Sequence, residues 1–204
     1  MNVRRRQVLI DLANANGAIN LQAGTMQAMF GPVEAASGVD GGESSVKPEY
    51  RGSGYVLLKP TFKHLILLDA YGEFPDGLVL DDALYLASWS SIKQRAVDGS
   101  DVSSALVGNE GSFNLMCSGS GVIALESPVP RAELIAVDLN NDTLKIDGNM
   151  ALAWSASLQR TVERSAKSLV GSAASGEGFV NVYRGTGRVL MALVDTHAPA
   201  FATA

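Results

Sequence analysis

The sequence predicts an all-β protein made of three quasi-equivalent antiparallel units, each a small sandwich or barrel. Three observations favour this class. A Gly-x-Gly signature recurs at nearly equal intervals, apolar residues alternate with polar ones along short segments, and turn residues interrupt every candidate helix. A unit of about 66 residues would be only marginally stable alone, because a domain of that size buries little surface. We therefore expect one compact domain over residues 1–204.

The Gly-x-Gly signature occurs three times, and each copy precedes an apolar run. The first glycines of the copies, Gly52, Gly119 and Gly185, lie 67 and 66 residues apart. The second glycines are Gly54, Gly121 and Gly187. Glycine lacks Cβ, so it allows positive φ, a bulge or a close approach of strands. We predict that the six glycines are structural turns at equivalent corners related by pseudo-threefold symmetry.

Two further signatures recur at the same interval. Residues 78–87 match residues 144–153 at an offset of 66, and residues 19–28 form a looser copy. Glu110-Gly111 and Glu177-Gly178 are 67 residues apart. The matches divide the domain into three repeats and a tail that we expect to be frayed, at approximately residues 17–70, 71–138, 139–196 and 197–204.

Turn residues delimit the expected strands. Asp147-Gly148 separates two alternating runs and is a favoured tight-turn pair, and Asp81 occupies the matching place one repeat earlier. Each repeat also contains a loop rich in Gly and Ser, at residues 36–43, 98–109 and 171–176. The pattern of residues 157–170 is almost equally compatible with a helix and with a strand. Their counterpart at residues 91–97 is short, so we predict strands for both and keep a short helix as the alternative.

Composition excludes several classes. The net charge of −5 and the pI of about 5.0 argue against a general nucleic-acid binder. The single cysteine, Cys117, rules out an intrachain disulfide, and no apolar run approaches the ~20 residues of a membrane span. No targeting signal is evident, so the cytoplasm is the expected compartment. Charged residues are 18 %, below the ordinary roughly 25 %, and the surplus apolar surface predicts a homo-oligomer, with a trimer as first expectation.

No catalytic, metal or cofactor signature emerges. His64 and His197 lie in different repeats and, with one cysteine, form no spaced ligand set. Residues 119–124 fit a loose dinucleotide pattern, but the prolines at 128 and 130 prevent the helix that this pattern needs. Cys117 is expected in the core rather than in a Cys–His dyad.

Two sets of charged residues leave alternatives open. Four aspartates recur near strand ends, where turn capping is favoured over acid–base work or cation binding: Asp69, Asp81, Asp138 and Asp147. Arg51 and Arg184 each precede a Gly-x-Gly. They are candidate contacts for an anionic ligand, or solvated residues that protect strand edges from aggregation.

The chain resembles a mitochondrial-biogenesis family named for altered inheritance of mitochondria. The resemblance rests on residues 19–24, the strand ends Leu67-Leu68-Asp69 and Ala136-Val137-Asp138, and above all residues 175–180 followed by 184–189; it spans roughly residues 17–196. It implies a fold like that of the tryptophan RNA-binding attenuation protein, a short double-stranded β-helix, with a tendency to oligomerise. It implies no established activity and supplies no catalytic residues.

These observations together predict a non-enzymatic, homo-oligomeric β-scaffold or binding module whose ligand is unknown. Two alternatives remain: an RNA-binding ring, by fold analogy alone, and a β-barrel protein that binds or hydrolyses a small ligand.

Overall fold

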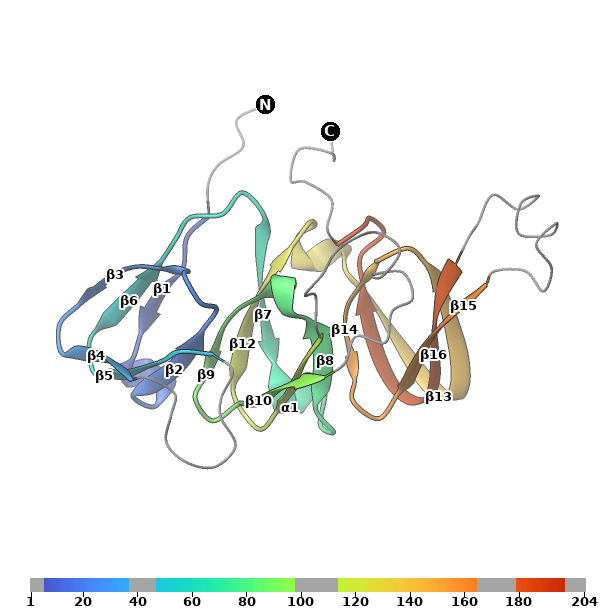
Figure 1. Cartoon of the computed structure of the whole chain (residues 1–204), viewed down its shortest axis with the longest axis horizontal. Coiled ribbons are helices and arrows are strands. Elements are labelled where there is room, and N and C mark those ends of the chain that lie inside the picture. Colours follow the sequence, from blue (N-terminus) through green and yellow to red (C-terminus); the bar gives the residue numbers. More distant parts are fainter. Residues whose placement is uncertain (1–5, 37–46, 98–113, 165–178, 197–204) are drawn as a thin grey trace.

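The computed structural model describes residues 6–36, 47–97, 114–164 and 179–196, and these residues form antiparallel strands in three sheets (Figure 1). The sheets contain three, six and seven strands. Within the described residues the α-helical structure is limited to one turn, α1 (Ala70–Glu73). The predicted all-β class is confirmed.

Sixteen strands follow one another along the described chain. The N-terminal third contains β1 (Leu9–Asp11), β2 (Ala18–Leu21), β3 (Met26–Phe30), β4 (Val33–Ala36), β5 (Glu49–Gly52) and β6 (Tyr55–Leu58). The middle third contains β7 (His64–Asp69), β8 (Leu78–Asp81), β9 (Tyr85–Trp89), β10 (Lys93–Val97), β11 (Asn114–Ser118) and β12 (Val122–Ser127). The C-terminal third contains β13 (Ile135–Asp147), β14 (Ala151–Ser155), β15 (Gln159–Arg164) and β16 (Phe179–Met191). Short 3-10 turns are η1 (Ala13–Ala15), η2 (Asp82–Leu84) and η3 (Arg131–Glu133).

The strands of each third pair in the same order. In the first two thirds the first and third strands flank the sixth (β1-β6-β3 and β7-β12-β9), and the second and fourth flank the fifth (β2-β5-β4 and β8-β11-β10). In the C-terminal third, the long strand β13 spans the positions of the first and second strands, and β16 spans those of the fifth and sixth. β14 and β15 occupy the third and fourth positions, and both pair with β16. A register irregularity falls at the corresponding place in β3, β9 and β14. We refer to these thirds as the N-terminal, middle and C-terminal units.

Neighbouring units share sheets. β2 pairs with β9, which joins the N-terminal unit to the middle unit in the six-stranded sheet. β8 pairs with β14, which joins the middle unit to the C-terminal unit in the seven-stranded sheet. The units therefore follow one another along the long axis, with β3 and β13 near opposite ends (Figure 1). A pseudo-threefold rotation between them is not confirmed.

Three apolar clusters hold the sheets together. The N-terminal cluster lies between the three- and six-stranded sheets and includes Leu21 and Val56. The middle cluster lies between the six- and seven-stranded sheets and includes Leu68 and Leu80. The C-terminal cluster takes Ile146, Tyr183 and its other strand residues from the seven-stranded sheet alone, because β13 and β16 bend and the sheet curves around its own core.

The first two Gly-x-Gly segments lie where the chain passes from one sheet to another, between β5 and β6 and between β11 and β12. The third differs from the prediction, because Gly185 and Gly187 lie within the long strand β16 and not at a turn between strands. Gly52 and Gly119 have φ of +140° and +121°. A Cβ at these positions would lie 2.0 Å from the Pro32 carbonyl oxygen and 2.5 Å from the Ser91 carbonyl oxygen. A side chain is therefore excluded there both by backbone conformation and by space.

The ambiguous segment at residues 157–170 is a strand over Gln159–Arg164, as predicted, and its counterpart is β10. Residues 165–170 lie outside the described residues. So do most or all of the three predicted Gly/Ser-rich loops, both Glu-Gly pairs and the tail at 197–204, including His197.

Candidate functional site

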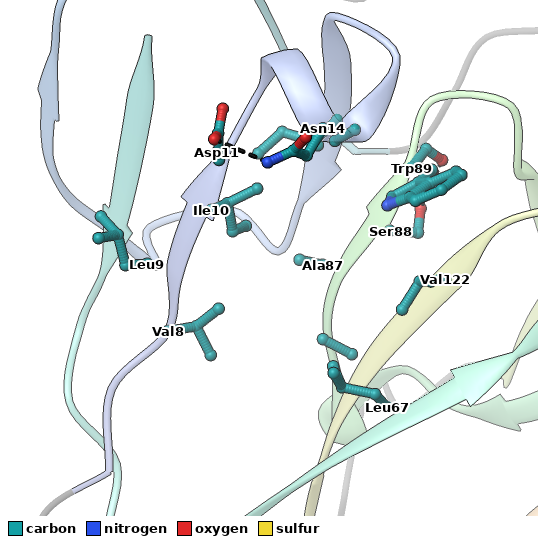
Figure 2. A pocket seen from close by; sticks show the side chains of 13 residues that line it. Val8, Leu9, Ile10, Asp11, Asn14, Leu67, Ala87, Ser88, Trp89 and Val122 are labelled. Carbon is teal, nitrogen blue, oxygen red and sulfur yellow. Dashed lines mark hydrogen bonds between the residues drawn. The ribbon is translucent and has the colours of Figure 1, made fainter.

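An open apolar cavity of about 290 Å³ lies between β1 and the face formed by β7, β9 and β12 (Figure 2). Ile10 of β1 and Val8, which precedes β1, line one side of the cavity. The six-stranded sheet lines the other side with Leu67, Trp89 and Val122. The volume is at the lower end of the range for small-molecule sites, about 300–1,000 Å³. The cavity suits a small apolar group.

Small side chains leave this space open. After β1 the chain forms η1, Ala13–Ala15, and Ala15 lines the cavity. In the middle unit the segment after β7 instead carries Phe74, which is buried in the middle cluster. A side chain as small as that of Ala15 leaves space that a ring such as that of Phe74 would fill.

The polar groups beside the cavity bond to one another. Asp11 accepts a hydrogen bond from the Asn14 side-chain nitrogen at 2.8 Å (Figure 2). It accepts a second one from the Ala13 backbone nitrogen at 3.0 Å. Each carboxylate oxygen of Asp11 thus accepts one of these hydrogen bonds. The described lining therefore offers little polar chemistry to a guest and no evident nucleophile with its base.

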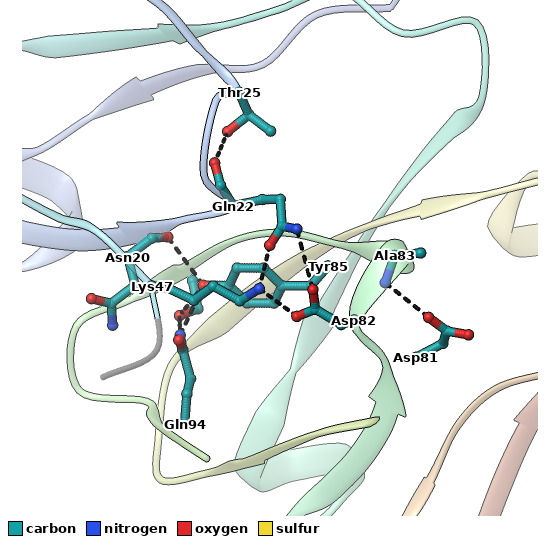
Figure 3. A network of polar contacts seen from close by, with 10 residues as sticks. Asn20, Gln22, Thr25, Lys47, Asp81, Asp82, Ala83, Tyr85 and Gln94 are labelled. Carbon is teal, nitrogen blue, oxygen red and sulfur yellow. Dashed lines mark hydrogen bonds and ion pairs between the residues drawn. The ribbon is translucent and has the colours of Figure 1, made fainter. Parts of the chain in front are cut away.

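A buried polar network lies close to the junction between the N-terminal and middle units (Figure 3). The Lys47 ammonium donates to Gln22 and to the carboxylate of Asp82, and Gln22 also donates to Asp82 at 3.3 Å. Lys47 also lies 5.2 Å from the ring centroid of Tyr85. Only 4 % of the Lys47 side chain is exposed, so these partners and not water compensate the buried charge.

The network continues through buried hydroxyl and amide groups. The Tyr85 hydroxyl donates to the Asn20 carbonyl oxygen at 3.1 Å and also contacts Ser88 Oγ, while Gln94 donates to both hydroxyls at 2.8 Å. Burial raises the pKa of Tyr85 well above its ordinary value. Asn20 and Ser88 are register partners across β2 and β9, so the network helps to hold two units together.

Cys117 is part of the core, as expected. Its side chain is fully buried in the middle cluster, and burial raises the pKa of the thiol to about 12. Because the thiolate is the nucleophilic form, Cys117 is unreactive in this environment at neutral pH.

The described residues contain no cluster of three or more His, Cys, Asp or Glu side chains that could hold a metal ion.

The four aspartates divide into two groups. Asp69 accepts a hydrogen bond from the Gly72 nitrogen at 3.1 Å and Asp81 accepts one from the Ala83 nitrogen at 2.8 Å, so both cap short helical turns. Asp147 ends β13, and Gly148 follows with φ of +65°.

The prediction that Asp138 lies at a strand end is wrong. It lies inside β13, because β13 continues through the expected turn as one long strand. Its carboxylate accepts two hydrogen bonds from the Arg188 guanidinium, at 2.7 and 3.1 Å. These bonds lower the pKa of Asp138.

The structure does not bring Arg51 and Arg184 together. Arg51, on β5 in the N-terminal unit, forms an ion pair with Glu49. Arg184, on β16 in the C-terminal unit, pairs with Glu163 and lowers the pKa of that carboxyl. The two arginines occupy similar places in different units, so one chain does not combine them in a single anion site.

His64 lies on β7 opposite Ser127. Partial burial and the nearby Arg6 charge lower the pKa of its imidazole, which favours the neutral form.

An exposed apolar surface at the N-terminal end was not predicted. Register places Leu9, Ala28, Phe30, Tyr55 and Leu57 on one side of the three-stranded sheet. We call these residues the N-terminal apolar face. Leu9 is 55 % exposed, Phe30 49 % and Tyr55 40 %, and the Phe30 and Tyr55 rings stack with centroids 5.4 Å apart. Alternation indicated strands here, but no local pattern tells whether another unit covers this side.

Comparison with known proteins identifies relatives. The family model described as Mitochondrial biogenesis AIM24 matches residues 2–192. A search of curated proteins yields no match. A crystal structure of a Streptococcus pyogenes protein is similar, with a TM-score of 0.67 and 22 % sequence identity over 96 % of this chain and 91 % of that one. At this identity the likeness shows a shared fold. Among the described residues, no helix is long and apolar enough to cross a membrane.

Proposed function

The chain belongs to the AIM24 family of mitochondrial biogenesis proteins, and from this premise we propose that it is a non-enzymatic β-scaffold that acts as a homo-oligomer. The carrying observation is the N-terminal apolar face, with three large apolar side chains exposed on one side of a three-stranded sheet. Full burial of a Leu or Phe side chain contributes about 1.5–3 kcal/mol, so a face of this kind favours association.

The chemistry of the described residues supports a scaffold over an enzyme. The arginines predicted to contact an anion are paired with glutamates, and the thiol is buried and protonated. The buried Lys47–Asp82 pair lies within a network near a unit junction, where it supports the fold. The alternative of an RNA-binding ring gains no supporting surface from these residues.

Light scattering coupled to size exclusion tests the proposal. We expect a mass that is a multiple of 21.4 kDa at micromolar concentration, with a trimer as the first expectation. The double variant Phe30→Ser/Tyr55→Ser should dissociate the assembly. Tyr71→Ser is the matched control, because Tyr71 is 61 % exposed on α1, outside the face. A mass of 21.4 kDa for the unmodified protein across the concentration range would overturn the proposal.

The cavity favours a second candidate function, the binding of a small apolar ligand. Ala15, which is 3 % exposed, lines the cavity, so Ala15→Leu should occupy part of its volume. We expect native mass spectrometry to find an apolar small molecule on the unmodified protein and less of it on the variant. Equal loading of both proteins, or no bound molecule on either, would contradict this function.

A further inference from the structure

We propose that β13 of one copy pairs antiparallel with β3 of a second copy, so that chains join end to end through a continuous sheet. This inference rests on the proposed homo-oligomer and names the surfaces that form it. The partner is therefore a second copy of this chain, and the contact is heterologous, since each copy contributes a different edge.

The strongest support is that the same contact already occurs twice within the chain. At the first junction Ile19, Asn20 and Leu21 of β2 pair with Trp89, Ser88 and Ala87 of β9. At the second junction Leu78, Val79 and Leu80 of β8 pair with Ser155, Trp154 and Ala153 of β14. The backbone bonds that extend these ladders also match, from Ser90 N to Ala18 O and from Ala156 N to Gly77 O. Both junctions join a second strand to a third strand of the next unit.

Each end of the described molecule has one strand edge that corresponds to half of this contact and has no described partner strand. In the N-terminal unit, β3 pairs with β6 alone among the described strands, which leaves one edge of β3 open. In the C-terminal unit, residues 144–147 of β13 occupy the second-strand position and pair with β16 alone among those strands. The two edges lie near opposite ends of the molecule, so they meet between copies rather than within one (Figure 1).

The internal junctions also specify the register. Leu144 corresponds to Ile19 and Leu78, and Phe30 corresponds to Trp89 and Ser155. Continuing the pattern pairs Leu144 with Phe30, Lys145 with Met29 and Ile146 with Ala28 of the second copy.

Burial at corresponding positions shows what the contact would cover. Ala87 and Ala124 are register partners in the middle unit, and they are 3 % and 6 % exposed beneath the N-terminal unit. Their counterparts in the C-terminal unit, Ala153 and Leu190, are 0 % and 5 % exposed. The corresponding pair of the N-terminal unit, Ala28 and Leu57, is only partly buried, and the neighbouring Phe30 is 49 % exposed. The N-terminal apolar face is therefore the surface that a preceding unit covers elsewhere in the molecule.

Disulfide trapping between copies tests the register. A Phe30→Cys chain mixed with a Leu144→Cys chain should form a disulfide-linked dimer under mild oxidation, because directly opposite residues have the Cα separation that a disulfide needs. A mixture of Phe30→Cys with Lys145→Cys is the control, since a shift of one residue places the two thiols on opposite faces. Cys117 is present in every chain but is fully buried.

A proline on the open edge provides a second measurement. In the continued register Lys145 and Met29 form a hydrogen-bonded pair, so the Met29 amide points toward the second copy and away from β6. Met29→Pro should remove the intermolecular bond while sparing the pairing of β3 with β6. Met29→Ala retains the amide and is the matched control. Circular dichroism and thermal melts establish that both variants fold.

The outcomes separate this inference from the proposal on which it rests. Disulfide formation in the Phe30→Cys and Leu144→Cys mixture but not in the control, together with dissociation by Met29→Pro, supports the end-to-end contact. An oligomer that gives no such disulfide, or gives it equally in the control, overturns the contact and leaves the homo-oligomer intact. A monomer at every concentration overturns both.

Discussion

Replacing Gly119 and Gly185 separately by alanine isolates the role of space in the Gly-x-Gly segments. The two glycines are the first residues of their signatures and have nearly the same φ, +121° and +123°. Their surroundings differ. A Cβ at Gly119 would lie 2.5 Å from the Ser91 carbonyl oxygen, whereas one at Gly185 would have its nearest neighbours, in Leu158 and Ser157, at 3.7 Å.

The expected magnitudes follow from these distances. Positive φ at a residue with Cβ costs about 1–3 kcal/mol, and this cost is common to both variants. Overlap with a backbone oxygen adds about 1–3 kcal/mol of overpacking for Gly119→Ala alone. We therefore expect Gly119→Ala to destabilise the fold by about 2–6 kcal/mol and Gly185→Ala by about 1–3 kcal/mol.

Urea unfolding followed by tryptophan fluorescence measures the difference. Trp89 and Trp154 report on separate clusters, since Trp89 packs against the N-terminal cluster and Trp154 belongs to the C-terminal one. At about 2–4 °C per kcal/mol for a chain of this size, thermal melts should also separate the two variants by several degrees. Equal destabilisation, within about 0.5 kcal/mol, would refute the argument from close approach, and unfolding free energies equal to that of the unmodified protein would refute the conformational argument as well.

Three further outcomes are expected. Asp82→Ala should cost about 3–5 kcal/mol in urea unfolding, because it leaves the buried Lys47 ammonium without its carboxylate, and Lys47→Met/Asp82→Leu should recover most of that loss; an unchanged free energy for the single variant would contradict the assignment. Cys117 should react with a thiol reagent at pH 8 only when the chain unfolds, since its pKa of about 12 and full burial protect it, whereas immediate reaction of the native protein would contradict its placement. Arg188 lowers the folded-state pKa of Asp138, so the stabilisation is full above the unfolded-state pKa of about 3.9 and is lost as pH falls through the folded value. The small stability difference between the unmodified protein and Asp138→Asn should therefore shrink between pH 7 and pH 3, and a difference that grows in acid would oppose this sign.

Several features of the fold were open to prediction because they depend on neighbouring residues. Alternation indicated strands, and turn residues excluded long helices, so the all-β class followed without tertiary information. The strand at Gln159–Arg164 was predicted by comparison with its counterpart in the preceding repeat. Two of the three Gly-x-Gly segments mark changes of sheet, at Gly52 and Gly119, where a Cβ would overlap a backbone oxygen.

The candidate sites were harder to predict from the sequence. Lys47 follows no motif, and only the fold brings it to Asp82 and Gln22. Asp138 resembled a turn residue, but β13 continues past it and Arg188 binds its side chain. The cavity depends on small residues of η1 facing a sheet from the next unit.

Local sequence was sufficient to establish that this protein is made of β-strands and to place several of its turns, such as those at Asp81 and Gly148. The tertiary structure decided which edges pair, which faces are covered and which charges meet. The physical reason is that alternation identifies two sides of a strand but not the neighbour on either side. Ala28 and Ala87 occupy matching positions in their strands, yet Ala87 is nearly fully buried and Ala28 is not, because a unit precedes one of them and no described unit precedes the other.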